Sequence, residues 1–340
     1  MDGKGKHKTG CGCGHSVQST EKPTLNKKIM LALLPCGLRN TFAQTLQKEF
    51  PEIIDNDKYI IDGNLNYEKS FYDQLESHNG LDVIPDIFIS SDINSVYHRR
   101  FIDKFLNDDF FEKLEPTITN KLFQKEQFVH PTGHLCWFTA NLLVIVADLE
   151  KVHEELLPQS WGDLLQEYFI RAITLRGDDD FFCNAILFPY LKNYGKEAIT
   201  QLGKNTLKGL HPSQMVKVIN AGNGNGTALY VMPYSFALKI RNTDRFKIIL
   251  TNEGPIVSPV QLMVKKDAYE RNKELINFIL SEEMSETLLR GGFPSVMSEK
   301  INAADLSKLN WISWNFILQN DIAVCKTELQ ALFYKGYTPS

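Results

Sequence analysis

The chain has 340 residues, of which 43% are hydrophobic and 11% aromatic, the composition of a globular protein. Its net charge of −4 gives no reason to expect nucleic acid or an anionic membrane surface as a partner. No window approaches the roughly 18 apolar residues of a transmembrane helix, and the length exceeds what one core usually supports, so we expect two lobes.

Residues 1–28 are rich in Gly, Lys, Ser and Thr, and we expect a disordered tail there. The tail contains Cys11, Cys13 and His15 in the string HKTGCGCGH. Thiolates and imidazoles this close can hold iron, zinc or an iron–sulfur cluster, although the spacing matches no known closed four-ligand site. The alternative is a flexible tail with two exposed thiols.

From residue 29 onward, apolar strands alternate with amphipathic helices, which predicts an α/β fold. The first expected elements are strand 29–35, helix 38–50, strand 58–62, helix 67–77, strand 82–90, and a helix that begins at residues 90–92. Residues 27–36 also resemble a lipoprotein export signal, but the apolar run is short and Pro35 is unfavourable beside a cleavage site. We therefore favour a core strand.

Six cysteines are too few and too irregularly spaced for a disulfide scaffold, so we expect reduced thiols. Together with the weak export signal, this predicts a cytoplasmic protein. The alternative is a chain exported or membrane-anchored through residues 27–36.

The longest apolar run, residues 136–147, predicts a strand buried on both faces. Pro158 then stops the chain and Ser160 is expected to cap a helix whose inner face carries Trp161 and Leu164. The remaining expected elements are strand 171–176, helix 181–194 ended by Gly195, helix 214–220, strand 227–232, a short helix after Pro233, strands 246–250 and 260–264, one long helix 269–290, and helix 311–333. The glycine-rich loop 222–226 precedes a strand instead of opening a helix, which excludes a phosphate loop.

Five strings in this order carry a family resemblance: DIFISSD at 86–92, the strand 141–148, PQSWGDLL at 158–165, NEGP at 252–255 before strand 260–264, and NFILSEEM at 277–284 running into GGFP at 291–294. From residue 29 to about 337 the chain resembles the type 2 periplasmic-binding-protein fold, meaning the solute-binding proteins of ABC importers. The strings look most like the branch that binds iron, thiamine and polyamines.

The resemblance implies an α/β protein with two lobes of mostly parallel sheet flanked by helices, joined by crossing strands 141–148 and 256–264, with the ligand cleft between them. It assigns 29–140 plus 256–300 to one lobe and 141–255 plus 301–340 to the other.

Ligands of such α/β lobes bind at the C-terminal ends of strands, where helix N-termini expose N–H groups. The candidate ligand-binding residues are accordingly Cys36, Gly37, Ser90, Ser91, Asp92, Asp178, Asp179, Phe181, Tyr234 and Ser235, with Trp137 on the cleft floor. The two serines suit an anion, whereas Asp178–Asp180 favour a cation or amine. Either set can also act only as helix caps.

Cys36 lies at a helix N-terminus, which favours a thiolate, although a buried inert cysteine is the commoner case. His130, His134 and Cys136 precede the crossing strand at spacings compatible with metal ligands, and with Cys36 they could form a metal site between the lobes. Lone histidines in loops are more often surface residues.

The predicted function is a solute-binding protein, not an enzyme, that captures a small polar solute or a metal species between two lobes. Its expected partner beyond the ligand is an ABC-transporter permease, with no nucleic acid, and we expect a monomer. One alternative is a cysteine-dependent, thiaminase-like enzyme on the same scaffold, using Cys36 or Cys136. Another is a cytosolic metal or iron–sulfur carrier that uses Cys11 and Cys13.

Overall fold

The computed structural model describes residues 28–53, 56–63, 75, 84–106, 110–124, 128, 130–178, 182–224, 226–300 and 306–339. The predicted Cys/His tail and, apart from Leu75, the predicted helix at 67–77 lie outside this part of the chain. Within it, no helix combines the length and apolar character needed to cross a bilayer, and none of its four cysteines is in a disulfide.

One mixed sheet of nine strands runs through the described molecule in the order β2-β1-β3-β9-β4-β7-β5-β6, with β8 paired to β4. The strands are β1 Met30–Leu34, β2 Tyr59–Gly63, β3 Ile87–Ser91, β4 Cys136–Asp148, β5 Ile173–Arg176, β6 Thr206–Leu210, β7 Leu229–Pro233, β8 Phe246–Ile249 and β9 Ile256–Val264.

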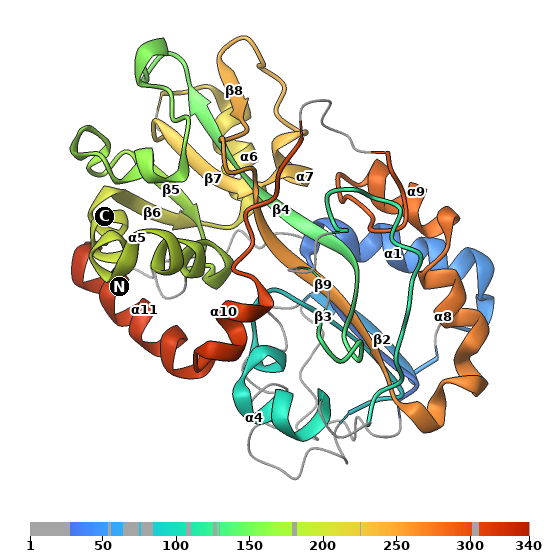
Figure 1. Cartoon of the computed structure of the whole chain (residues 1–340). Coiled ribbons are helices and arrows are strands. Elements are labelled where there is room, and N and C mark those ends of the chain that lie inside the picture. The colour runs from blue at the N-terminus through green and yellow to red at the C-terminus, as the bar shows by residue number, and fades with distance from the viewer. Residues whose placement is uncertain are drawn as a thin grey trace, which may run out of the picture.

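The sheet has two parallel halves joined by a pair of long antiparallel strands. β1 pairs in parallel with β2 and β3, and β5 pairs in parallel with β6 and β7. Between these halves, β4 and β9 run antiparallel to each other and are buried along their whole length. We call the half around β1–β3 the first lobe and the half around β5–β8 the second lobe; Figure 1 shows β4 and β9 passing from one to the other. The two-lobe α/β fold is confirmed.

Helices cover both lobes. The α-helices are α1 Cys36–Glu49, α4 Arg99–Phe101, α5 Asn184–Asn205, α6 Pro212–Ala221, α7 Tyr234–Ala237, α8 Lys273–Ile279, α9 Glu282–Arg290, α10 Trp314–Gln319 and α11 Ile322–Gly336. A π-helical turn, Ile102–Leu106, extends α4, and short 3₁₀ turns lie at Pro51–Ile53, Ser95–Tyr97, Glu154–Leu156, Trp161–Leu165, Glu167–Phe169, Lys266–Ala268 and Glu270–Asn272. Figure 1 shows α1, α8 and α9 beside the first lobe and α5 with α11 beside the second.

The sequence of strand β3 does not alternate between polar and apolar residues, because both faces of the strand are buried. Ile87 and Ile89 join the core beneath α1, α8 and α9, whereas Phe88 joins the larger core on the opposite face. A strand buried on both faces reads as a continuous apolar run. The same holds for β1, whose five residues are all buried.

Three predicted helices differ from the observed ones because a polar or glycine residue intervenes. The predicted helix 269–290 is divided at Ser281, whose side-chain oxygen accepts a hydrogen bond from Met284 N at 3.1 Å and so caps α9. The helix predicted to end at Gly195 does end there, since Gly195 adopts a φ of 81° and a ψ of −174°, but a second helical segment follows at once, and α5 comprises both. The helix predicted from 311 is divided into α10 and α11, and Asp321 caps the second.

Two further differences lie near strand ends. The residue that caps the turn after β3 is Asn94, which accepts from Val96 N, and the chain then forms short helical turns in place of one helix. Strand β6 was not predicted, since TLKGL combines a glycine with three partly exposed residues and lacks a strand pattern.

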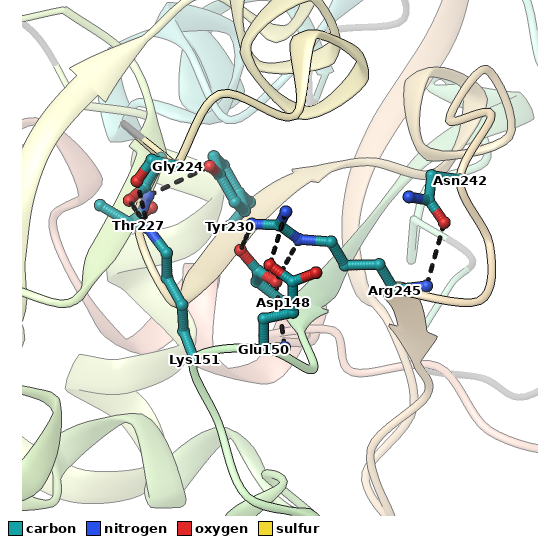
Figure 2. A network of polar contacts seen from close by, with 9 residues as sticks. Asp148, Glu150, Lys151, Gly224, Thr227, Tyr230, Asn242 and Arg245 are labelled. Atoms are coloured by element: carbon teal, nitrogen blue, oxygen red, sulfur yellow. Dashed lines mark hydrogen bonds and ion pairs between the residues drawn. The ribbon is translucent and has the colours of Figure 1, made fainter.

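The end of β4 is fixed within the second lobe by a buried ion pair (Figure 2). Arg245 donates through Nε and Nη2 to the two carboxylate oxygens of Asp148, at 2.8 and 2.7 Å, and its Nη1 lies 2.7 Å from Glu150. Beside it, Lys151 Nζ donates to the carbonyls of Gly224 and Gly226. The glycine-rich loop is therefore tied to β4 as a structural element.

Candidate ligand site between the lobes

The C-terminal ends of five parallel strands carry polar or small residues that face the junction of the lobes. In the first lobe, β1 leads into Cys36 and Gly37, and β3 ends at Ser90–Asp92. In the second lobe these positions are Arg176 after β5, His211 after β6, and Tyr234 and Ser235 after β7. Ligands of α/β sheets bind at such strand ends, so this is where contacts between lobes matter most.

The first contact between the lobes joins Asp92 to Arg176. Arg176 Nη1 lies 3.6 Å from Asp92 Oδ2, and both side chains are mostly buried. The other carboxylate oxygen, Oδ1, accepts from Ile93 N at 2.8 Å. Asp92 N donates to Pro259 O of β9 at 2.9 Å, which fixes the residue in a left-handed conformation with φ 72°. The carboxylate is thus held rigidly opposite the guanidinium.

Cys183, just before α5, completes this group. Arg176 Nη1 contacts Cys183 Sγ at 3.2 Å, and the thiol donates to Asp92 Oδ2 at 3.6 Å. Burial raises the pKa of Cys183 to about 12, so the side chain is a neutral thiol. Cys183 therefore acts as a hydrogen-bonding group here and not as a nucleophile.

The second contact between the lobes joins the start of α1 to α7. A Cβ atom added at Gly37 would lie 3.1 Å from Ser235 Oγ and 3.2 Å from the Phe236 ring, so only glycine fits without displacement. The backbone at Gly292, where φ is 81°, also lies close to Ser235, so that a Cβ atom added there would meet the Ser235 Cα atom at 2.9 Å. Ser235 Oγ is buried and has no hydrogen-bond partner among the described residues. No side chain caps α1.

His211 links these two contacts. Its ring lies 6.3 Å from that of Phe236, and its Nδ1 accepts from Ser213 N at the start of α6. Burial first, and then the positive charge of Arg176, lower the pKa of His211. Neutral His211 and cationic Arg176 were both missed from the sequence. The strand-end rule would have found Arg176, which ends the predicted strand 171–176, but His211 follows the unpredicted β6.

The other predicted ligand residues have varied positions. Ser90 Oγ and Ser91 O both accept from Asn94 Nδ2, at 2.8 and 2.7 Å, which binds the serines into the turn after β3. Asp178 and Cys36 are exposed. Asp179 and Phe181 lie outside the described residues. Trp137 is buried in the first lobe, edge-on to Trp311 at 4.7 Å, and does not join the strand-end residues.

The structure does not bring the predicted metal ligands together. Cys136 joins the core beneath α1 and α8, where burial raises its pKa to about 12, and His134 Nδ1 contacts Leu106 O. Burial, followed by the nearby His134, lowers the pKa of His130 to about 4. In the part of the chain that the structure describes, no three His, Cys, Asp or Glu residues are grouped so as to hold a metal ion. Cys11, Cys13 and His15 lie outside that part.

A cavity of about 420 Å³ is lined by residues of the second lobe alone, such as Glu155, Tyr168 and Asn252. It therefore cannot be the space that two lobes enclose. We place the ligand site at the strand ends, where Gly37 meets Ser235 and Asp92 meets Arg176, because side chains of both lobes already meet there.

A family model described as bacterial extracellular solute-binding protein matches residues 82–320. No curated protein sequence matches the chain significantly.

Solved structures share the fold at low identity. A ferric binding protein from Campylobacter jejuni has a TM-score of 0.62 and 15% identity, covering 90% of this chain and 98% of its own. A periplasmic binding protein from Actinobacillus pleuropneumoniae with bound fructose-6-phosphate has a TM-score of 0.63 and 14% identity, covering 91% and 98%. Iron-bound HitA from Pseudomonas aeruginosa has a TM-score of 0.60 and 14% identity, covering 89% and 99%.

The matched family is extracellular, so the predicted cytoplasmic location is wrong. That prediction rested on the weak export signal and on unpaired cysteines. Neither the export signal nor the pairing of cysteines is determined by how the two lobes fold. The core-strand interpretation of the run before Cys36 is nevertheless correct, since β1 is fully buried.

Proposed function

The chain belongs to the bacterial extracellular solute-binding proteins, and we propose that the solute it captures for an ABC importer is small and anionic, carrying a carboxylate or a phosphate group. Proteins of this class bind small ligands and deliver them to permeases, and they are binding proteins and not enzymes. The proposed division of the chain, 29–140 with 256–300 and 141–255 with 301–340, puts Asp92 and Arg176 in different lobes.

The Arg176–Asp92 contact carries the proposal. Strong guanidinium–carboxylate pairs have N–O distances of about 2.7–2.9 Å, often with two parallel bonds. Here a single contact of 3.6 Å joins the two groups. A ligand anion can therefore offer Arg176 shorter, bidentate bonds than Asp92 does. Asp92 then serves as a weak substitute for the ligand anion in the unliganded protein.

Two further groups favour an anion at the same junction. Ser235 Oγ is a buried hydroxyl whose hydrogen no described residue accepts. The start of α1, without a side-chain cap, is adjacent to it at Gly37. Helix N-termini and hydroxyls both stabilise negative charge. Each unsatisfied buried hydroxyl costs about 1–3 kcal/mol, which a ligand oxygen at Ser235 would recover.

Iron is the second candidate because several similar structures are ferric binding proteins. Against it, the described residues hold no group of three His, Cys, Asp or Glu side chains for a metal. Burial raises the pKa of Tyr234, the phenol at the end of β7, and a protonated phenol is a poor metal ligand.

Native mass spectrometry with elemental analysis of the full chain separates the two. We expect an organic anion to co-purify without stoichiometric iron. In binding assays with that anion, Arg176→Gln should lower affinity about tenfold or more, since a hydrogen bond to a charged group contributes about 1.5–3 kcal/mol.

Arg176→Lys is the matched control, because it keeps the charge and loses the planar fork. It should retain part of the affinity. Equal binding by wild type and Arg176→Gln, or one iron per chain, would contradict the proposal.

A further inference from the structure

The segment around α10 leaves the second lobe, reaches the first lobe and returns. Before α10, Asn310 pairs with the end of β9 nearer the second lobe: Val257 N donates to Asn310 O at 3.0 Å, and Asn310 N donates to Pro255 O at 2.9 Å. After α10, α11 packs against α5 of the second lobe. In Figure 1 the red α10 lies beside both α11 and the teal α4, which follows β3. We call residues 312–320 the α10 arm.

The α10 arm is docked on the first lobe by aromatic contacts and by one hydrogen bond. The Trp314 ring stacks on the Tyr97 ring at 5.2 Å and lies edge-on to the His130 ring at 4.5 Å. Near the other end of α10, Leu318 O accepts from Arg99 Nη2 of α4. Trp314 is 3% exposed, so this contact between the lobes is a buried one.

Two rings at the docking contact carry a buried N–H group that no described residue accepts. These groups are Trp314 Nε1 and His130 Nε2. His130 Nε2 carries the hydrogen because Nδ1 of the same ring accepts from Thr132 N at 3.2 Å. A buried donor without an acceptor destabilises the arrangement that buries it, and water satisfies the donor once the contact opens. Packing therefore holds the α10 arm in place against the loss of these hydrogen bonds.

Ser313, immediately before α10, has a strained backbone. Its φ is 70° and its ψ is 152°, a region that glycine alone populates freely. A residue keeps such a conformation only where its surroundings hold it from both sides. Here Lys192 of the second lobe donates to Trp311 O at 3.3 Å, while Trp314 is held by Tyr97 of the first lobe. The strain at Ser313 therefore depends on the docking of the α10 arm.

We infer that the α10 arm is a latch between the lobes, which docks on the first lobe when the strand ends meet and detaches from it when the lobes separate. The arm stays with the second lobe, because the backbone bonds of Asn310 and the packing of α11 on α5 carry no comparable strain. Detachment relieves the strain at Ser313 and exposes the two N–H groups to water. Solute bound between the lobes stabilises the docked arm, and weaker docking lowers the affinity for solute. The inference holds for any solute that closes the lobes, whether anionic or not.

Hydrogen exchange of the full chain, measured by mass spectrometry without added solute, tests the strain. Ser313→Gly removes the strain from the docked arm, and glycine is nearly as good a helix cap as serine. The amides of residues 316–320 should therefore exchange about tenfold more slowly than in wild type. Ser313→Ala is the matched control, since it keeps the strain and loses the bond from Phe316 N, and its exchange should not be slower than in wild type. Faster exchange in Ser313→Gly would overturn the inference.

Small-angle scattering tests whether the arm and the lobes move together. Trp314→Ala removes the stacking on Tyr97, so exchange at 316–320 should rise at least tenfold and the radius of gyration should increase. Val324→Ala, at a 62% exposed position of α11, should change neither quantity.

Arg99→Gln keeps the test valid if Trp314→Ala does not fold, because Arg99 is exposed. It removes the bond to Leu318 O and should raise both quantities by a smaller amount, whereas Arg100→Gln, at the exposed neighbour, should not. Faster exchange at 316–320 with an unchanged radius of gyration would mean that the arm moves without the lobes, and would overturn the latch. So would unchanged exchange in the folded variants, or an equal rise of exchange in α11.

Discussion

Two arginine–aspartate pairs in this protein share their chemistry and differ in geometry. Arg245 and Asp148 lie in one lobe and form two bonds of 2.7 and 2.8 Å (Figure 2). Arg176 and Asp92 lie in different lobes and share one contact of 3.6 Å. A single long contact is weaker than two short bonds, so the Arg176–Asp92 pair costs less to separate than the Arg245–Asp148 pair. The geometry therefore favours a structural role for the pair within one lobe and an exchangeable role for the pair between lobes.

Asp148→Asn should have the largest effect on stability. Asp148 is 1% exposed, and its replacement leaves Arg245 with only the exposed Glu150 as an ionic partner, so we expect a cost of about 3 kcal/mol. The free energy of unfolding from urea titration measures this. Glu150→Gln, at the 65% exposed partner of the same arginine, should cost under about 1 kcal/mol. Similar losses of unfolding free energy in the two variants would contradict a structural role for the Arg245–Asp148 pair.

Gly37→Val should act on the pairing between lobes without unfolding them. The added side chain would meet Ser235 and Phe236, and overpacking of this kind costs about 1–3 kcal/mol in the closed arrangement. We expect small-angle scattering to show a larger radius of gyration and ligand affinity to fall. Lys247→Val, at an exposed position of strand β8 in the second lobe, tests whether any added valine has this effect.

Asp92→Asn should have a smaller effect of opposite sign on ligand binding. Asparagine tolerates the left-handed φ of 72° and keeps the acceptor for Ile93 N, while the charge that competes for Arg176 disappears. Affinity for an anionic ligand should rise by less than about 1 kcal/mol, the value of a weak ion pair. Calorimetry on wild type and variant measures it. A weaker affinity would mean that Asp92 contacts the ligand directly.

The smallest expected effect is a pH dependence at the exchangeable pair. The pKa of His211 is lowered in the folded protein, so the unfolded chain binds this proton more readily. The stability that His211 contributes is present above its unfolded pKa of about 6.5 and is lost as pH falls below it. Urea titrations between neutral and acidic pH should therefore show a shallower decline in His211→Asn, which retains a capping side chain for α6. An unchanged slope would contradict the lowered pKa of His211.

Strand–helix alternation and the long apolar run at β4 are local signals from which the α/β class could be predicted, whereas the two lobes and the crossing strand 256–264 were expected only from the family resemblance. Helix ends were predicted unevenly. Gly195 was recognised because glycine favours a left-handed φ, but the division at Ser281 was not, because its capping depends on the path of the backbone. β6 was missed because Lys208 and Gly209 have weak strand preference and are held by pairing with β5.

The candidate site could be predicted only in part. The strand-end rule selected Gly37, Asp92 and Ser235, whose positions depend on topology. Which strand ends face each other across the lobes depends on long-range packing, so the pairing of Asp92 with Arg176 was not foreseeable. Trp137, predicted for the cleft floor, lies in the core edge-on to Trp311, a contact that depends on the path of the distant C-terminal segment.

The C-terminal segment limits how far the lobes can separate. Asn310 pairs with β9 through Val257 N and Pro255 O, and the Trp314 ring stacks on Tyr97 of the first lobe. The carbonyl of Trp311 accepts from Lys192 of α5, in the second lobe, against which α11 also packs. The segment is thus held against both lobes. Wide separation of the lobes would therefore have to break the stacking of Trp314 on Tyr97 or the hydrogen bond from Lys192 to Trp311 O.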